Sequence, residues 1–590
     1  MSSPASATVP APRLASALAA AICLLVPLMA LVFHPALYAP FSAPKNALLI
    51  FAGTSLFALA AAGGVLKRPP RAAAWPAAAL MVVIVLAWAA SPFPHFGGRV
   101  VWLRLAGPML AWVAISALAG RERLMLLAIA FAGAAESPIA IAQWFLGLDF
   151  FHGSTLLYQR MHLYGTFGNP DFVAVFIAAT VPAALTLARD FASTSRAWTT
   201  FWWVMLAMEL VAIIGTGCRT GLAAALAGAA VTLLMRNLRR PPRHWLRPRL
   251  VLWMALLAAA STFLVLSRNE HDFGLAGKAR VFVWRVALSD DARRRPLGTG
   301  PGTLAYVYGR RVSPYYIALN DPTQRRFVTY ERTANNDFVQ AIVETGWPGL
   351  FTLLALLAVW GRFVTGVARA PNDDFQPAAI AAAAAGGVAA ICVAALAEGP
   401  MQRAEIWMLL WLWLALPVAG FEPSKIRGFE EAQRFSQPRN LETSKPIFFL
   451  GWTAALAAIA LSGWFGARQI EASYLAQRGE QREFANRYAD AVADYRRSVA
   501  LDPTNGTPWF NLTRTLAKSG DLSAALATSY QTSRWMDEDT VIILRVAILR
   551  AQHNYPLALR EAAEGFARRP WEGQLYADVV EITRELGLAP

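Results

Sequence analysis

Thirteen runs of apolar residues occupy the first 465 positions, and they limit what this chain can fold into. Inside a bilayer only a helix or a closed barrel satisfies every backbone amide, and a spanning helix needs about 20 mostly apolar residues. Only 16% of the residues are charged, whereas soluble domains carry roughly 25%. We therefore expect an all-α, polytopic membrane bundle of 12–13 transmembrane helices. The predicted spans are 14–33, 47–66, 72–90, 100–119, 122–147, 170–188, 200–216, 220–235, 249–267, 347–368, 376–397, 403–420 and 447–465.

Basic residues alternate between the two sides of these spans. Loops on one side carry 21 Lys and Arg residues, counting Arg13 at the N-terminus. By the positive-inside rule the N-terminus is cytoplasmic, and thirteen crossings put the loop 268–346 and the C-terminal segment on the outer side of the membrane. The net charge of +16 then reflects topology, and without a basic stripe with interleaved aromatics we expect no nucleic-acid partner. The other side carries five basic residues, Lys45, Arg99, Arg160, Arg219 and Arg403.

The composition becomes polar after the last span, which divides the chain into a membrane domain, 1–465, and a C-terminal domain, 466–590. Ala491, Ala525 and Ala558 recur at spacings of 34 and 33 residues. This period resembles that of tetratricopeptide repeats and predicts an α-solenoid of helical hairpins, with an unrelated helical bundle as the alternative. Because such arrays present a concave surface, we expect a protein partner on 466–590.

The predicted outer loop 268–346 holds eleven Arg residues and Lys278. It contains a turn-rich piece, Pro296–Gly302, and an amphipathic pattern that predicts a helix over Glu331–Gly346. Loops of this length are usually functional. The chain has only three Cys, and neither a disulfide framework nor a metal-ligand spacing is present, so we expect no metal and no cofactor.

Several separated segments around this loop share one pattern. They read GTFGNPDF over 165–172, GCRTG over 217–221, RVFVW over 280–284, ANNDFVQ over 334–340 and ETG over 344–346. In this order they resemble the O-antigen ligase and polymerase superfamily of membrane glycan transferases. The resemblance implies an undecaprenyl-pyrophosphate-linked glycan as donor, with lipid A–core, a growing glycan or a protein as acceptor, among membrane lipids. It also implies that the membrane is a bacterial inner membrane and that the loop 268–346 and the domain 466–590 are periplasmic. Ligase, polymerase and protein O-oligosaccharyltransferase stay open.

The resemblance also assigns roles to individual residues. Arg219 and Arg280 would bind the pyrophosphate, because guanidinium groups bind phosphate oxygens bidentately and keep their charge. Asn169, Arg332 and Asn336 would contact substrate, and the reaction would be a metal-independent inverting displacement. The competing interpretations are an interfacial anchor for Arg219 and a solvated loop charge for Arg280.

The chain departs from the family at one position. Asn335 stands where the family has a histidine, the proposed base, and an amide takes up no proton at neutral pH. A base could instead come from Glu331, Asp337, His152 or His162. Alternatively, the reaction needs no strong base, or the protein has lost transferase activity. In the last case the chain would be a non-catalytic scaffold that recruits partners through its repeats.

Two charges fall inside predicted spans, where charge is costly and marks a functional-site candidate. Arg104 lies near the outer end of its span, where snorkelling to the interface is an alternative explanation. For Glu136 we expect a buried pair with an Arg of a neighbouring helix. A transporter is the remaining alternative function, but no matched pair of Gly/Pro-broken helices supports it.

Overall fold

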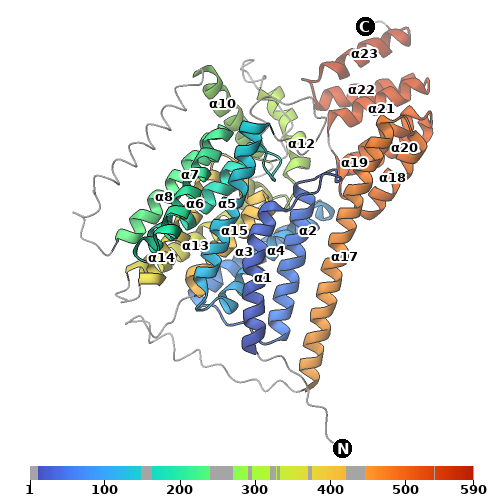
Figure 1. Ribbon diagram of the computed structural model, residues 1–590. Coiled ribbons are helices and arrows are strands. Elements are labelled where there is room, and N and C mark those ends of the chain that lie inside the picture. Colours follow the sequence, from blue (N-terminus) through green and yellow to red (C-terminus); the bar gives the residue numbers. More distant parts are fainter. Residues whose placement is uncertain are drawn as a thin grey trace, which may run out of the picture.

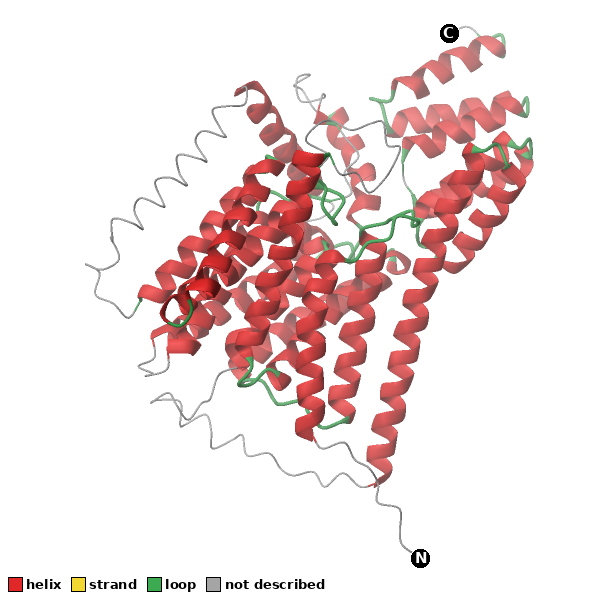
Figure 2. Ribbon diagram, viewed as in Figure 1, coloured by secondary structure: helices red, strands yellow, loops and turns green. Residues whose placement is uncertain are grey.

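The computed structural model describes residues 11–147, 163–238, 270–289, 295–318, 327–328, 333–369, 375–419, 445–536 and 538–588. Every regular element in these ranges is helical (Figure 2), and they contain 20 α-helices. The all-α expectation is confirmed for this part of the chain.

Twelve of the thirteen predicted spans coincide with helices, and the thirteenth, 249–267, lies outside the described residues. Among the described helices, ten are long and apolar enough to cross a membrane, whereas α3 and α15 have shorter apolar stretches. These twelve are α1 (Ala11–Leu31), α2 (Ser42–Ala62), α3 (Arg71–Ala89), α4 (Pro94–Ala117), α5 (Glu122–Leu146), α6 (Pro170–Asp190), α7 (Arg196–Thr216), α8 (Arg219–Asn237), α13 (Asp337–Arg369), α14 (Phe375–Ala395), α15 (Ala404–Ala419) and α17 (Lys445–Phe484).

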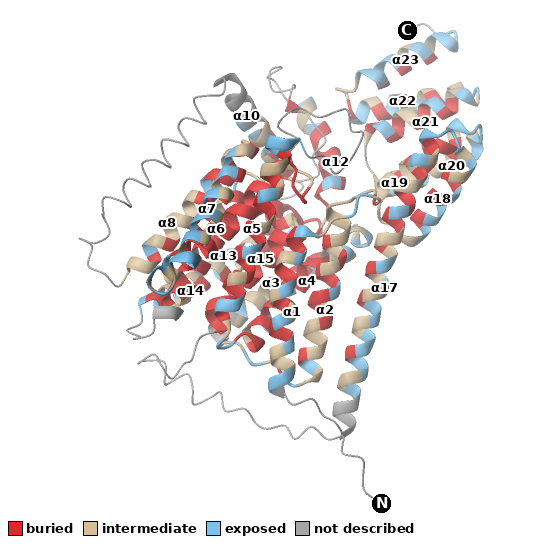
Figure 3. Ribbon diagram, viewed as in Figure 1, coloured by how far each residue is buried: buried red, intermediate tan, exposed pale blue. Residues whose placement is uncertain are grey.

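The centre of the bundle is formed by α6, α14 and α15, which carry long runs of buried residues (Figure 3). All sixteen residues of α15 are buried. Small residues let these helices approach closely: a Cβ added to Gly386 of α14 would lie 2.5 Å from the Gly228 carbonyl oxygen of α8. Such contacts replace the hydrophobic driving force that helices lack inside a bilayer.

Polar contacts near helix ends mark one end of the bundle, here called the basic end. Arg121 donates to Ser16 Oγ at 2.7 Å, and Arg236 pairs with Asp190 at 2.8 Å. Figure 1 shows α10, α12 and the C-terminal helices at the opposite end, here called the far end. The relative placement agrees with the alternating charge, while the cytoplasmic and periplasmic assignment of the two ends stays a prediction.

The structure places Lys45 differently from the prediction. We expected it in a loop, but it lies in the first turn of α2 and is fully buried. Its Nζ donates to the carbonyl oxygens of Met29 at 3.0 Å and Ala30 at 2.7 Å, and it lies 4.0 Å from the centre of the Phe167 ring. Buried cations persist only where such partners replace water.

Two helices lie within the predicted loop 268–346, α10 (Glu270–Ala287) and α12 (Leu304–Ile317). They pack on each other through a small apolar core that includes Phe282, Tyr308 and Val312. The helix predicted to begin at Glu331 is α13, which is helical only from Asp337 and kinks at Gly346. This kink, at φ 69° and ψ −176°, separates the short outer turns from the apolar span.

The C-terminal domain consists of consecutive helices, each packed against the next. The predicted boundary at 465 falls inside α17, which continues without a break from the apolar span into the first helix of this domain. Ala491, Ala525 and Ala558 are fully buried in alternate helices, and the tetratricopeptide assignment stays a prediction. The helices after α17 are α18 (Tyr488–Leu501), α19 (Gly506–Lys518), α20 (Leu522–Trp535), α21 (Asp539–Ala551), α22 (Tyr555–Arg568) and α23 (Gly573–Glu585).

Candidate active site at the far end

The turn that starts α13 places Asn335 in an unusual backbone conformation. Its φ is 49°, in the left-handed region that asparagine tolerates better than most residues. Its Oδ1 accepts a hydrogen bond from Thr333 Oγ1 at 3.0 Å. Asn336 caps the helix, because its Oδ1 accepts from the backbone N–H groups of Phe338 and Val339, both at 3.0 Å. The predicted substrate contact at Asn336 is therefore, in this structure, a helix cap.

Asp337 is buried and fixed by two hydrogen bonds. Its carboxylate accepts from Met401 N at 2.8 Å and from Gln402 Nε2 at 2.8 Å. Because each oxygen already holds a partner, these contacts favour a positioning role for Asp337 over that of a base. They join the start of α13 to the short helix η5 (Pro400–Gln402) between α14 and α15.

Arg104 holds the same short helix from the other side. Its guanidinium donates to Met401 O and to Gln402 Oε1, and it lies 4.7 Å from the centre of the Trp407 ring. The side chain is buried among these groups, so the snorkelling explanation is wrong. The sequence indicated that Arg104 is a charge inside a span, but it did not indicate that Arg104 contacts η5.

Arg280 and Trp284 lie one turn apart on α10 and attach this helix to the site. Arg280 Nη2 pairs with Glu398 Oε1 at 2.6 Å, and Trp284 Nε1 donates to Ala334 O at 2.8 Å. The RVFVW segment thus contacts both the Asn335 turn and the end of α14. Glu398 is not among the site residues predicted from the sequence, although an acidic residue directly after an apolar span is a pattern that could have indicated a site residue.

Arg219 is the first residue of α8 and is half-buried. Its neighbour Thr220 donates to Glu398 Oε1 at 3.5 Å, so α8 and Arg280 of α10 meet at one carboxylate. Asn336 Nδ2 donates to Leu396 O at 2.9 Å and brings the start of α13 to the same place. The structure therefore gathers three of the separated sequence segments around 396–398.

Asn169, a further predicted substrate contact, is the N-cap of α6 and accepts from Asp171 N at 2.8 Å. It begins another helix whose N-terminus opens at the far end. Helix N-termini favour anions, because their N–H groups are unpaired and the dipole is positive there. Four predicted or alternative site residues, Glu331, Arg332, His152 and His162, lie outside the described residues.

A cavity of about 200 Å³ adjoins the Asn335 turn. Its lining includes Thr333, which bonds Asn335, and Gln402, which bonds Asp337. Gln340 and Glu344, which are hydrogen bonded to each other at 2.9 Å, add further polar atoms. The site can therefore present hydrogen-bonding groups to a polyhydroxyl ligand and guanidinium groups to an anion.

Glu136 does not form the Arg pair that we expected. It accepts hydrogen bonds from Thr166 N at 2.8 Å and from Thr166 Oγ1 at 2.9 Å, and Lys45 attracts it electrostatically. Gly165, at φ 50°, lets the loop approach so closely that an added Cβ would lie 1.9 Å from Glu136 Oε1. This carboxylate holds the GTFGNPDF loop in place.

Two comparisons with known proteins bear on the site. No curated protein gives a significant match to the chain. Residues 203–354, which contain Arg219, Arg280 and the Asn335 turn, match the family model described as O-antigen ligase.

Proposed function

We propose that this membrane protein transfers a glycan from undecaprenyl pyrophosphate to an acceptor hydroxyl on the periplasmic side, in the manner of an O-antigen ligase. The observation that carries the proposal is the meeting of α8, α10 and α13 at residues 396–398, since all three helices begin or lie within the matched region. A polymerase or a protein O-oligosaccharyltransferase would use the same arrangement.

The chemistry assigned to the site is a direct displacement. The acceptor oxygen bonds to the anomeric carbon, the bond from that carbon to the phosphate oxygen breaks, and the acceptor releases its proton. Arg219 and Arg280 stabilise the negative charge that develops on the departing pyrophosphate. Glu398, which pairs with Arg280 in this structure, holds the guanidinium at the place where the donor enters.

Asn335 orients the acceptor hydroxyl in this scheme, because its amide both donates and accepts hydrogen bonds. Under this hypothesis Asn335→His keeps or raises activity, while Asn335→Leu lowers it. If Asn335→Leu leaves transfer unchanged, Asn335 has no role in the reaction.

The test of the function is the surface glycan of a deletion strain that carries each variant at equal protein level. We expect Arg219→Ala and Arg280→Ala to abolish the glycan, and Arg123→Ala, a matched cation over the Phe191 ring at the basic end, to leave it unchanged. In the deletion strain, uncapped lipid A–core with accumulated lipid-linked polymer would identify a ligase. Lipid A–core capped with a single repeat unit would identify a polymerase, and unglycosylated protein would identify a protein transferase.

A scaffold remains the second candidate because of Asn335. If both Arg variants keep normal glycan while deletion of the C-terminal helices abolishes it, the transfer proposal is wrong and the scaffold is correct.

A further inference from the structure

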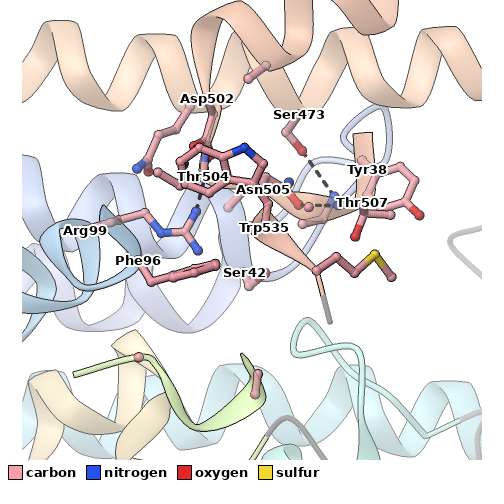
Figure 4. A pocket seen from close by; sticks show the side chains of 18 of the residues that line it. Tyr38, Ser42, Phe96, Arg99, Ser473, Asp502, Thr504, Asn505, Thr507 and Trp535 are labelled. Atoms are coloured by element: carbon pink, nitrogen blue, oxygen red, sulfur yellow. Dashed lines mark hydrogen bonds and ion pairs between the residues drawn. The ribbon is translucent and has the colours of Figure 1, made fainter. Parts of the chain in front are cut away.

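A second, larger cavity lies between the far end of the bundle and the C-terminal helices (Figure 4). Its volume is about 400 Å³, within the range of about 300–1,000 Å³ that is usual for ligand sites. We call it the interdomain cavity. Residues that line it include Ser42, Phe96, Arg99, Asp502, Asn505 and Trp535.

The walls of the interdomain cavity are tied together by polar contacts between the two domains. The backbone N–H groups of Tyr38 and Ala39 donate to Ser473 O at 3.1 Å and to Ser473 Oγ at 3.2 Å. Arg99 Nη1 pairs with Asp502 Oδ2 at 3.6 Å, and these side chains come from α4 and from the turn after α18. The cavity is thus formed in advance, which lowers the entropic cost of binding.

One wall of the cavity is aromatic. Trp535, at the end of α20, lies with its ring centre 5.7 Å from that of Phe96 and 5.1 Å from that of His95. Tyr306 of α12 continues the cluster at 4.9 Å from Phe96. Aromatic faces beside hydroxyl, amide and carboxylate groups suit a sugar ring, which is apolar on its C–H face and polar at its rim.

The charge of the cavity disfavours an anionic ligand. Arg99 is the one cation among the described residues that line it, whereas Asp502, its partner at 3.6 Å, and Glu538 supply two carboxylates. Carboxylates outnumber cations in this lining, so the cavity disfavours a pyrophosphate. The interdomain cavity therefore fits a different part of the reaction from the donor pyrophosphate.

The interdomain cavity also adjoins the candidate active site. Asn46, Arg99, Val100 and Gly302 line both it and the smaller cavity of about 200 Å³ next to the Asn335 turn. The two cavities therefore lie side by side at the outer turns of α2 and α4, between the C-terminal helices and the Asn335 turn.

We propose that the interdomain cavity binds a neutral saccharide segment of the acceptor and directs its terminal hydroxyl toward Asn335. This inference rests on the proposed transfer function and adds a place for the second substrate. It gives the C-terminal helices a direct part in the reaction, because Trp535, Asn505 and Asp502 supply one side of the binding site.

The test uses the full chain in membrane vesicles, a radiolabelled lipid-linked donor, and acceptor prepared from the deletion strain, which accumulates it unmodified. Trp535→Ala removes the aromatic wall, and Ser42→Trp fills the cavity from α2. Each should raise KM for the acceptor on the order of tenfold, which corresponds to about 1.4 kcal/mol, and leave kcat within about twofold. Trp535→Tyr, which restores an aromatic face, should recover most of the loss.

The matched control is Trp571→Ala, because Trp571 also joins the two domains, with its ring 5.3 Å from that of Tyr316, but does not line the interdomain cavity. An unchanged KM in Trp535→Ala and Ser42→Trp overturns the inference, as does an equal rise in Trp571→Ala or an acceptor that proves to be unglycosylated protein. If Arg280→Ala still abolishes turnover in those cases, the proposed function stands without the inference. If the wild-type chain transfers nothing, both fail.

Discussion

Replacing the buried Arg104 by methionine tests whether this side chain supports η5 and, through it, the start of α13. The substitution keeps much of the volume but removes the donors to Met401 O and Gln402 Oε1 and the contact with Trp407. A hydrogen bond to a charged group contributes about 1.5–3 kcal/mol, and a desolvated cation–π contact about 2. Because Met401 O and Gln402 Oε1 are left without this donor, and an unsatisfied buried polar group costs about 1–3 kcal/mol, we expect a loss of roughly 4 kcal/mol.

Thiol labelling during heating measures this loss in detergent-solubilised protein. Cys218 is buried, and Cys23 and Cys392 are half-buried, so a thiol-reactive fluorescent dye gains signal as the fold opens. A loss of this size should lower the unfolding midpoint by about 3 °C, because the entropy of unfolding of the 590-residue chain is about 2.1 cal/mol/K per residue. Arg123→Met, which removes an exposed cation 4.6 Å from the Phe191 ring centre, should shift the midpoint by less than about 1 °C.

Transfer activity provides the second measurement for Arg104→Met. Because Asp337 is bonded to Met401 N and Gln402 Nε2, loss of Arg104 should loosen the Asn335 turn and lower activity even well below the midpoint. If Arg104→Met melts like the wild type and keeps its activity, the support that we assign to Arg104 is refuted.

Three further substitutions test other parts of the structure. Trp284→Phe should cost about 1 kcal/mol by removing the hydrogen bond to Ala334 O, and should lower transfer without loss of protein, as judged by surface glycan at equal expression. Gly165→Ala should sharply reduce the folded yield in membranes, because its Cβ would overlap Glu136, whereas Gly361→Ala, with open space around it, should not. Glu483→Gln should destabilise the C-terminal domain by about 2 kcal/mol, since its carboxylate accepts from two cations, and limited proteolysis would detect the loosened helices.

The membrane part of the fold could be predicted from the sequence because its signal is local. Any run of about 20 apolar residues, such as 122–147 or 170–188, must form a helix in a bilayer whatever surrounds it. The same reasoning placed Lys45 in a loop, because a lone basic residue near a span usually reaches water. Its burial depends on carbonyl groups at the end of another helix, which no local pattern indicates.

The sequence predicted individual residues of the site but not the contacts between them. Ordered segments identified Arg219, Arg280 and the Asn335 turn, and the structure shows that α8, α10 and α13 meet. Glu398, where they meet, lies outside every segment, and pairing between residues 118 positions apart leaves no periodic signal. Asn336 and Asn169 cap helices, and a polar residue before a helix caps it whether or not a ligand binds, so their substrate contacts stay predictions.

The unbroken α17 has a mechanical consequence. Its 40 residues span about 60 Å at 1.5 Å per residue, so one rigid rod fixes both the height and the rotation of the C-terminal helices above the bilayer. One extra residue near its middle would turn those helices by about 100° and carry Trp535 away from Phe96. A change in the length of α17 therefore changes which side of the C-terminal helices faces the far end of the bundle.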